Sequence, residues 1–305
     1  MPCRALGRSG LHIAPLAFGG NVSGRIADRA TSLALLDAFV DGGFKLIDTA
    51  DVCSRWVPGH SGGESASLIG AWLSLPGNAG KRQRMLIATQ VGKDMGGDAA
   101  TPRIGLLRRR IRPSVEDSLC RLRRLRTDRS DRYQSHDDDA MTPLQETLAA
   151  YAELIGEGKV RAIGASKHLP APLTAALALS ARLGLARYQS LQPLYNLMDR
   201  AACATALEPL CRAEGLGVIN FFGLARGFLS GKLRSEADLA ESPHGAGCKA
   251  SLNDRGQRVP AALDAVAQAR GARPAQVALA WQIYRPNPKG RGDVRRHRAL
   301  PARGS

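Results

Sequence analysis

Polar side chains stand at or next to the ends of several short apolar runs in this chain. They comprise a carboxylate, an imidazole, a hydroxyl and three amides, at Asp48, Gln90, His136, Ser166, Gln192 and Asn220. A carboxylate or an imidazole moves protons in general acid–base catalysis, while hydroxyl and amide groups hold a ligand in place. If these runs are parallel strands of a barrel, their ends converge and the side chains belong to one site.

Cysteine thiols are the other reactive groups of the chain. The six cysteines lie at positions 3, 53, 120, 203, 211 and 248, with no CxxC and no paired spacing of a zinc site. We interpret them as reduced thiols, which favours a cytoplasmic protein.

Short β-like runs alternate with amphipathic helical stretches. The expected strands are Leu16–Gly19, Lys45–Asp48, Met85–Gln90, Asp131–His136, Ala162–Ser166, Ser190–Gln192 and Gly217–Phe221. The expected helices are Ala30–Asp41, Glu64–Leu73, Ser114–Leu125 with a Ser114/Asp117 capping pair, Pro143–Gly156, Leu169–Leu183, Ala201–Ala213 and Pro260–Trp281, the last broken at Gly271–Pro274. A small hairpin is expected at residues 4–13.

This alternation predicts parallel βαβ units, which build either a doubly wound sheet or a β/α barrel. A doubly wound dinucleotide fold usually carries GxGxxG after an early strand, and neither the segment 19–24 nor the segment 245–247 matches it. Polar residues close nearly every strand instead, as they do at the mouth of a barrel. We therefore predict an α/β fold of the TIM-barrel type.

The net charge of +16 on 305 residues is concentrated in two segments. Residues 103–132 carry eleven arginines against four acidic residues, and residues 285–305 carry seven basic residues against one aspartate. Within the first segment, the basic helix Ser114–Arg126 is interpreted as a solvated outer face. The second segment lacks the interleaved aromatics of a nucleic-acid binder. No nucleic-acid partner is expected.

Membrane association is not expected either. No apolar run approaches the roughly 18 residues of a membrane-spanning helix. The opening residues 1–8 lack the apolar core of a signal peptide. Both observations favour a cytoplasmic location.

Six segments, in the same order, resemble the aldo-keto reductases. They are LGRSGLHIAPLAFGG, FKLIDTADVCS, GGESASLIGAWL, TPLQETLAAYAELIGEGKVRAIGASK, LQPLYNLMDR and GVINFFGLARGFLSGK, and the resemblance covers about residues 4–283. It implies a (β/α)8 barrel that reduces a small aldehyde or ketone with NADPH and has no Rossmann motif. It also places the loop that contains His136 and Asp137–Asp139 at the rim of the active site, and it implies no metal ion there.

The family mechanism uses an aspartate, a tyrosine, a lysine and a histidine. The resemblance places Asp48 and His136 at the first and last of these positions, Cys53 at the tyrosine position and Gln90 at the lysine position. A cysteine sulfur lies only one bond beyond Cβ and falls short of where a tyrosine hydroxyl reaches. Lys93 and Lys167 are candidates to restore the missing cation. Loss of the general acid costs about 10²–10⁴-fold, so weak activity is expected.

The resemblance also implies a cofactor site. Ser166 and Gln192 match positions that hold the nicotinamide carboxamide, Lys167 replaces the usual asparagine, and Phe221 matches a ring that stacks on nicotinamide. The other residues implied in cofactor binding are Gly19, Gly20 and Asp48, together with Leu224, Gly227 and Lys232 of a loop expected over the pyrophosphate.

Two departures from the family pattern concern stability. Period-two alternation turns Arg132 inward together with His136, and Asp48 is the partner expected for its charge. The segment 285–305 replaces the closing β/α unit with a basic, disordered tail, which we interpret as an out-of-frame reading. The expected organisation is a barrel domain of residues 1–284 followed by this tail.

Two functions remain open on the sequence alone. The first is an NADP-dependent oxidoreductase of the aldo/keto reductase type with weak activity. The second is a catalytically inactive barrel that binds a nucleotide or a partner, or the product of a decaying gene. The natural substrate and the oligomeric state are not accessible from the sequence.

Overall fold

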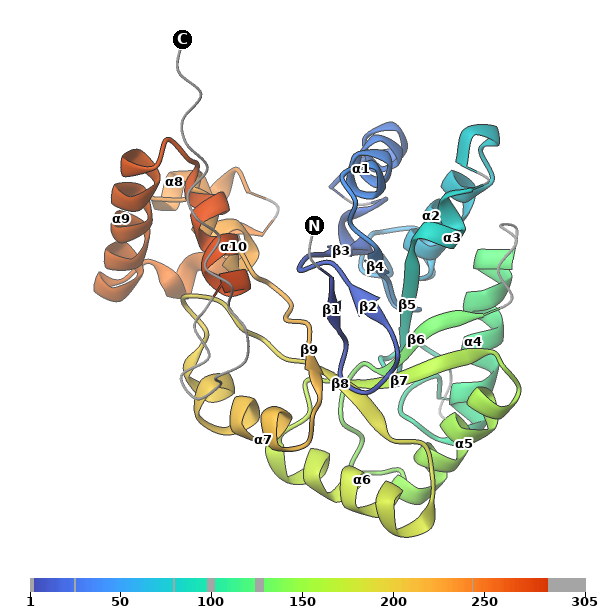
Figure 1. Ribbon diagram of the computed structural model, residues 1–305. Coiled ribbons are helices and arrows are strands. Elements are labelled where there is room, and N and C mark those ends of the chain that lie inside the picture. The colour runs from blue at the N-terminus through green and yellow to red at the C-terminus, as the bar shows by residue number, and fades with distance from the viewer. Residues whose placement is uncertain are drawn as a thin grey trace.

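A curled parallel sheet organises the molecule. The computed structural model describes residues 3–24, 26–78, 80–97, 102–123, 129–242 and 244–284. In this part of the chain seven strands pair in sequential order and curve into an open half-barrel (Figure 1). They are β3 (Ala17–Gly19), β4 (Leu46–Asp48), β5 (Leu86–Val91), β6 (Ser130–Ser135), β7 (Val160–Ser166), β8 (Tyr188–Gln192) and β9 (Gly217–Val218). The TIM-barrel type is confirmed, with one unit fewer within these residues.

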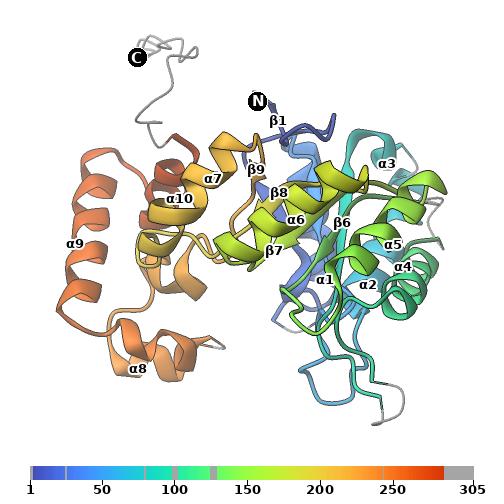
Figure 2. The ribbon, with the colours of Figure 1, turned by 90° about the horizontal axis from the view of Figure 1, so that it is seen from below.

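Helices cover the convex face of this sheet in both views (Figures 1 and 2). They are α1 (Arg29–Asp41), α2 (Glu64–Leu73), α3 (Lys81–Arg84), α4 (Arg108–Arg123), α5 (Leu144–Gly156), α6 (Pro170–Leu183) and α7 (Glu208–Ala213). Three more helices, α8 (Glu236–Ala240), α9 (Asp254–Ala269) and α10 (Pro274–Tyr284), group beside β9. No described helix has the length and apolarity needed to cross a membrane.

The last strand is shorter than the sequence predicts. The expected strand ran to Phe221, but β9 ends at Val218. Beyond it, Phe221 pairs only through an isolated bridge with Leu194. The side-chain amide of the intervening Asn220 donates to the carbonyl of Tyr195 at 2.7 Å, and the backbone amide of Phe221 donates to the carbonyl of Pro193 at 3.1 Å. The predicted break near Gly271–Pro274 separates α9 from α10 as expected, although α9 begins six residues before the predicted start.

Helix α4 also begins earlier than predicted, and the expected capping pair is wrong. Ser114 lies inside the helix and donates to the carbonyl of Arg110 at 2.7 Å. The first amide of α4, at Arg108, instead donates to Glu146 Oε1 of α5 at 2.9 Å. A carboxylate from another helix therefore satisfies one of the unpaired N–H groups at this N-terminus. Local sequence spacing carries no signal for such a cap.

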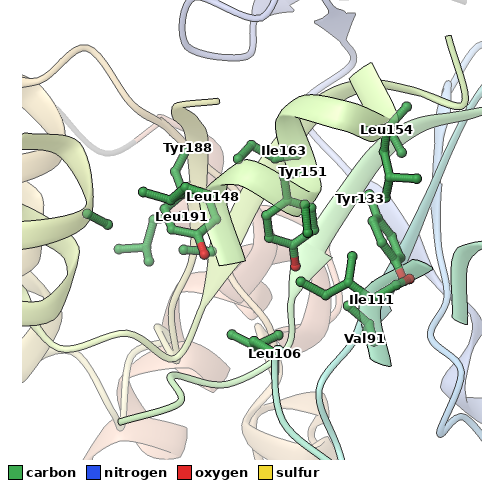
Figure 3. Packing of buried hydrophobic residues seen from close by; sticks show 14 of the residues in the cluster. Val91, Leu106, Ile111, Tyr133, Leu148, Tyr151, Leu154, Ile163, Tyr188 and Leu191 are labelled. Atoms are coloured by element: carbon green, nitrogen blue, oxygen red, sulfur yellow. The ribbon is translucent and has the colours of Figure 1, made fainter. Parts of the chain in front are cut away.

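The largest apolar core lies between β5–β8 and helices α4–α6 (Figure 3). Tyr133, Tyr151 and Tyr188 are fully buried there. The hydroxyl of Ser135 lies 2.9 Å from the hydroxyl of Tyr151 and 2.7 Å from that of Tyr188. Tyr133 and Ser135 thus point toward the helices, which leaves Arg132 and Gln134 to point into the barrel, as the alternation predicted.

The predicted hairpin closes the amino-terminal end of the barrel. β1 (Arg4–Ala5) pairs antiparallel with β2 (His12–Ile13). Leu6 and Leu11, each 2% exposed, pack against inward-facing residues of the strands, among them Leu46 and Ala88. Each side chain of this size contributes about 1.5–3 kcal/mol on burial. The opposite end, where the strands finish, remains available for a site.

Candidate active site

A cavity of about 1000 Å³ opens among the carboxyl ends of the strands and extends between β3 and β9. Most of the residues singled out in the sequence line it: Gly19, Gly20, Asp48, Cys53, Gln90, His136, Ser166, Lys167, Gln192 and Phe221. Leu224, Gly227 and Lys232 do not line it. Leu224 packs against the apolar cluster of the C-terminal helices, and Lys232 is exposed.

Three glutamine amides surround the Asp48 carboxylate at the floor of this cavity. Oδ2 accepts from Gln192 Nε2 at 2.7 Å and from Gln90 Nε2 at 2.9 Å. Oδ1 accepts from Gln134 Nε2 at 3.2 Å. Gln90 Nε2 also donates to Gln192 Oε1 at 3.1 Å. Gln90 of β5 and Gln192 of β8 come from strands that are not neighbours in the sheet, yet their amides are held to one another as well as to the aspartate.

This arrangement favours the ionised form of Asp48. Each of its three described hydrogen bonds comes from an N–H donor, whereas a protonated carboxyl would need an acceptor. Burial raises the pKa of Asp48, and the charge of Arg132 opposes that rise most strongly, followed by the amide hydrogen bonds. The amides supply partial positive charge without supplying a cation.

The expected pairing of Arg132 with Asp48 is indirect. Arg132 Nε donates to Ser190 Oγ at 2.8 Å, and Nη2 donates to Gln134 Oε1. Gln134 then donates its own amide to Asp48. The expectation of direct contact failed because the side chain of Gln134 stands between the two charges on the same inward face.

Cys53 is a weak acid in this structure. Its side chain is 6% exposed, and burial, together with the charge of Asp48, raises the pKa of the thiol to about 12. A free cysteine thiol has a pKa of about 8.5, so Cys53 is a weaker acid than an exposed cysteine. At neutral pH the group stays protonated and gives up its proton less readily than an exposed thiol.

His136 follows β6 directly and lines the cavity. Burial, with a smaller effect of the nearby Lys167, lowers the pKa of its imidazole to about 3. The ring is thus neutral at physiological pH, with one N–H donor and one acceptor nitrogen. Its Nδ1 atom is buried and has no hydrogen-bond partner in the described part of the chain. A neutral imidazole suits the orientation of a carbonyl oxygen.

Lys93 and Lys167 do not supply the cation expected beside Asp48. Both bind Asp137, Lys93 through Oδ2 and Lys167 through Oδ1 at 3.2 Å. They follow β5 and β7, so they flank His136 at the cavity mouth. Both positive charges are therefore paired with Asp137 at the cavity mouth instead of lying beside the amide of Gln90.

Lys167 is held in an unusual backbone conformation. Its φ angle of 55° lies in the left-handed region, which non-glycine residues seldom adopt. The amide of Lys167 donates to the carbonyl of Gln192 at 3.1 Å, and Ser166 Oγ donates to the same carbonyl at 3.2 Å. The conformation carries Lys167 Nζ to 5.7 Å from the ring centroid of Phe221.

Arg226 and Trp56 are among the cavity residues that were missed in the sequence. Arg226 lines the cavity and places its guanidinium 4.5 Å from the ring centroid of Phe222. Trp56 lines it with 48% of its surface exposed. Arg226 lies within the segment 223–232 that the resemblance had marked, where the neighbouring Leu224 and Gly227 were chosen instead. No spacing signal pointed to Trp56.

Comparison with known proteins agrees with this geometry. The model of the aldo/keto reductase family matches residues 15–292. The uncharacterized oxidoreductase YrpG of Bacillus subtilis is 31% identical over 284 residues, which cover 92% of this chain and 83% of the relative. Aldo-keto reductase YhdN of the same organism is 32% identical over 220 residues, covering 72% and 60%. Protein tas of Escherichia coli is 28% identical over 299 residues, covering 91% and 84%. With the half-barrel and its strand-end cavity, these matches place the chain in the aldo/keto reductase family, among oxidoreductases.

Proposed function

We propose that the protein reduces small aldehydes or ketones with NADPH, at a low rate. The observation that carries the proposal is the convergence of Asp48, His136 and Gln192 in one strand-end cavity of about 1000 Å³, which is at the upper end of the usual range for ligand sites. Phe221 supplies an apolar ring there, and Lys167 and Arg226 supply cations suited to an anionic dinucleotide. The residues present thus fit the cofactor.

Each residue has a separate role in this proposal. NADPH, when bound, supplies the hydride. The neutral His136 donates one hydrogen bond to the carbonyl oxygen and fixes its position. The amide network holds Asp48 ionised beside Cys53, whose thiol pKa of about 12 makes it a poor proton donor. The weakness of the acid accounts for the low expected rate, since a well-placed general acid contributes about 10²–10⁴-fold.

Fluorescence titration with NADPH, followed by measurement of NADPH consumption with a panel of aldehydes and ketones, tests the proposal. We expect binding, slow turnover, and a loss of turnover of about tenfold or more in His136→Ala. Arg226→Ala should weaken NADPH binding because it removes a cation from the cavity. Arg182→Ala, an exposed arginine of α6 outside the cavity, is the matched control.

The weak acid at Cys53 favours one second candidate, a barrel that binds a nucleotide without catalysis. NADPH binding with no turnover of any carbonyl would support this second function and contradict the first. Absence of NADPH binding would contradict both.

A further inference from the structure

Arg132 is a charged side chain enclosed in the barrel interior. It is 0% exposed, and burial lowers the pKa of its guanidinium to about 10, which leaves it protonated at neutral pH. Its described hydrogen bonds reach a hydroxyl and an amide oxygen, and its Nη1 atom has no partner among the described residues. A buried cation without a carboxylate contact is costly, so some other feature must compensate this charge.

The surrounding strands are shaped to hold this guanidinium. A Cβ atom on Gly164 of β7 would lie 2.9 Å from Arg132 Nε and 2.7 Å from Ser190 Oγ, so any larger residue would displace these two side chains. Ser190 of β8 fixes Nε, and Gln134, two residues along β6, fixes Nη2. The guanidinium therefore has one defined position.

Gln134 connects this position to the floor of the cavity. Its Oε1 accepts from Arg132 and its Nε2 donates to Asp48 Oδ1. The amide is thereby polarised from both ends, with a cation on its oxygen and a carboxylate on its nitrogen. Gln90, opposite Gln134 in the register of β5 and β6, contacts the other Asp48 oxygen and is neutral.

We infer that Arg132 is the counter-cation of Asp48, acting through Gln134, and that it takes over the charge which a lysine at position 90 would bring. Arg132 is thus a positioning residue that keeps Asp48 ionised and the three-glutamine network in place. Because Asp48 belongs to the proposed active site, this role in catalysis rests on the proposed function, whereas the charge compensation stands independently of it.

Moving a positive charge between positions 132 and 90 tests whether Arg132 compensates the charge of Asp48. The test requires no enzymatic activity. Arg132→Leu leaves Asp48 without its cation, and Gln90→Lys adds a second cation to the same network. Each single change should lower the melting temperature, by on the order of 5–10 °C for Arg132→Leu. The double variant, which has one cation and one carboxylate again, should melt above Arg132→Leu.

Neutral and charge-conserving variants separate charge from packing. Gln90→Met should not rescue Arg132→Leu, because it fills similar space without a charge. In the Arg132→Lys background, which keeps a cation at position 132, Gln90→Lys should lower the melting temperature instead of raising it. In the otherwise unchanged protein, Gln90→Lys should melt below Gln90→Met.

Two results would overturn the inference. One such result is that Gln90→Lys changes the melting temperature equally in the otherwise unchanged protein and in the Arg132→Leu background. A lysine at position 90 would then not compensate for the loss of Arg132. Equal melting temperatures of Gln90→Lys and Gln90→Met would show the same, even if Arg132→Leu alone failed to fold. A double variant that folds where Arg132→Leu does not would support the inference.

An activity measurement separates this inference from the proposed function. Cys53→Tyr with Gln90→Lys introduces the tyrosine and lysine that the family resemblance implies at these positions, but it leaves two cations in the hydrogen-bond network of Asp48. Addition of Arg132→Leu to that pair should raise carbonyl reduction, because it leaves one cation for the single carboxylate of the network. If neither the protein nor any variant reduces a carbonyl while the melting temperatures follow the order given above, the proposed function fails and the charge compensation holds. A gain that Arg132→Leu does not increase would overturn the positioning role.

Discussion

His136 shows how burial determines the behaviour of a single side chain. Its imidazole pKa of about 3 lies below that of an unfolded histidine, about 6.5, so the folded state binds the proton less well. The stability that depends on neutral His136 is complete above pH 6.5. It is lost as the pH falls from about 6.5 toward 3, because the unfolded chain takes up a proton that the folded protein excludes.

The pH dependence of unfolding measures this effect. In urea unfolding between pH 4 and pH 6, His136→Gln should remove a slope of about 1.4 kcal/mol per pH unit, which corresponds to one proton. His12→Gln, an exposed histidine of the hairpin, controls for the loss of an imidazole. An identical slope in the protein with and without His136 would contradict the expectation.

Burial also determines the reactivity of the Cys53 thiol. At pH 8 a thiol with a pKa of about 12 is ionised to about one part in 10⁴, and the thiolate is the reactive form. Iodoacetamide should therefore label the exposed Cys3 and Cys120 and leave Cys53 unmodified in the folded protein. Mass spectrometry of peptides after timed labelling gives the rates. Labelling of Cys53 as fast as that of Cys120 would show that its thiol is not protected.

At the scale of the elements, the connection after β7 stores strain at Lys167. Lys167→Asn should relieve a left-handed conformation that costs most L-residues about 1–2 kcal/mol and that asparagine tolerates. The lost contact with Asp137 joins side chains that are 37% and 31% exposed, and it is worth less than about 1 kcal/mol. Urea unfolding should find Lys167→Asn about 1 kcal/mol more stable than Lys93→Asn.

Lys93→Asn is the matched control for this change. It removes a contact with the same Asp137, and Lys93 does not have a positive φ angle. Equal destabilisation by the two substitutions would mean that the conformation at Lys167 carries no strain.

The elements also show where sequence patterns suffice. Alternation of residue types predicted the inward direction of Arg132, because side-chain direction in a strand depends only on local backbone geometry. The direct hydrogen-bond partners of Arg132, Ser190 and Gln134, were not predicted, since they depend on how far the side chain of the neighbouring Gln134 reaches. The start of α4 was missed for a similar reason, because Glu146 of another helix satisfies its first amide.

At the scale of the whole molecule, the order of the strands explains why the site could be largely predicted. Sequential parallel strands bring every carboxyl end to one side, so residues that end strands must meet there. Leu224 and Lys232 lie outside the cavity lining, in the segment where the chain leaves β9 for the C-terminal helices, although Phe221 and Arg226 of the same segment line it. No repeating geometry constrains the path there.

The cavity is closed by segments from opposite ends of the described chain. Arg4 Nη2 donates to the carbonyl of Ile283 at 2.9 Å, across 279 residues, and Leu279 and Gln282 of α10 join Arg4 in the lining. During vectorial synthesis on the ribosome, this wall can form only after α10 has emerged, although the first strands emerge much earlier. Such a high-separation contact belongs to the late, slow part of folding. Capture of a ligand in the cavity would therefore mark the completion of folding in nascent chains, and truncation before α10 should yield a sheet that has formed but binds nothing.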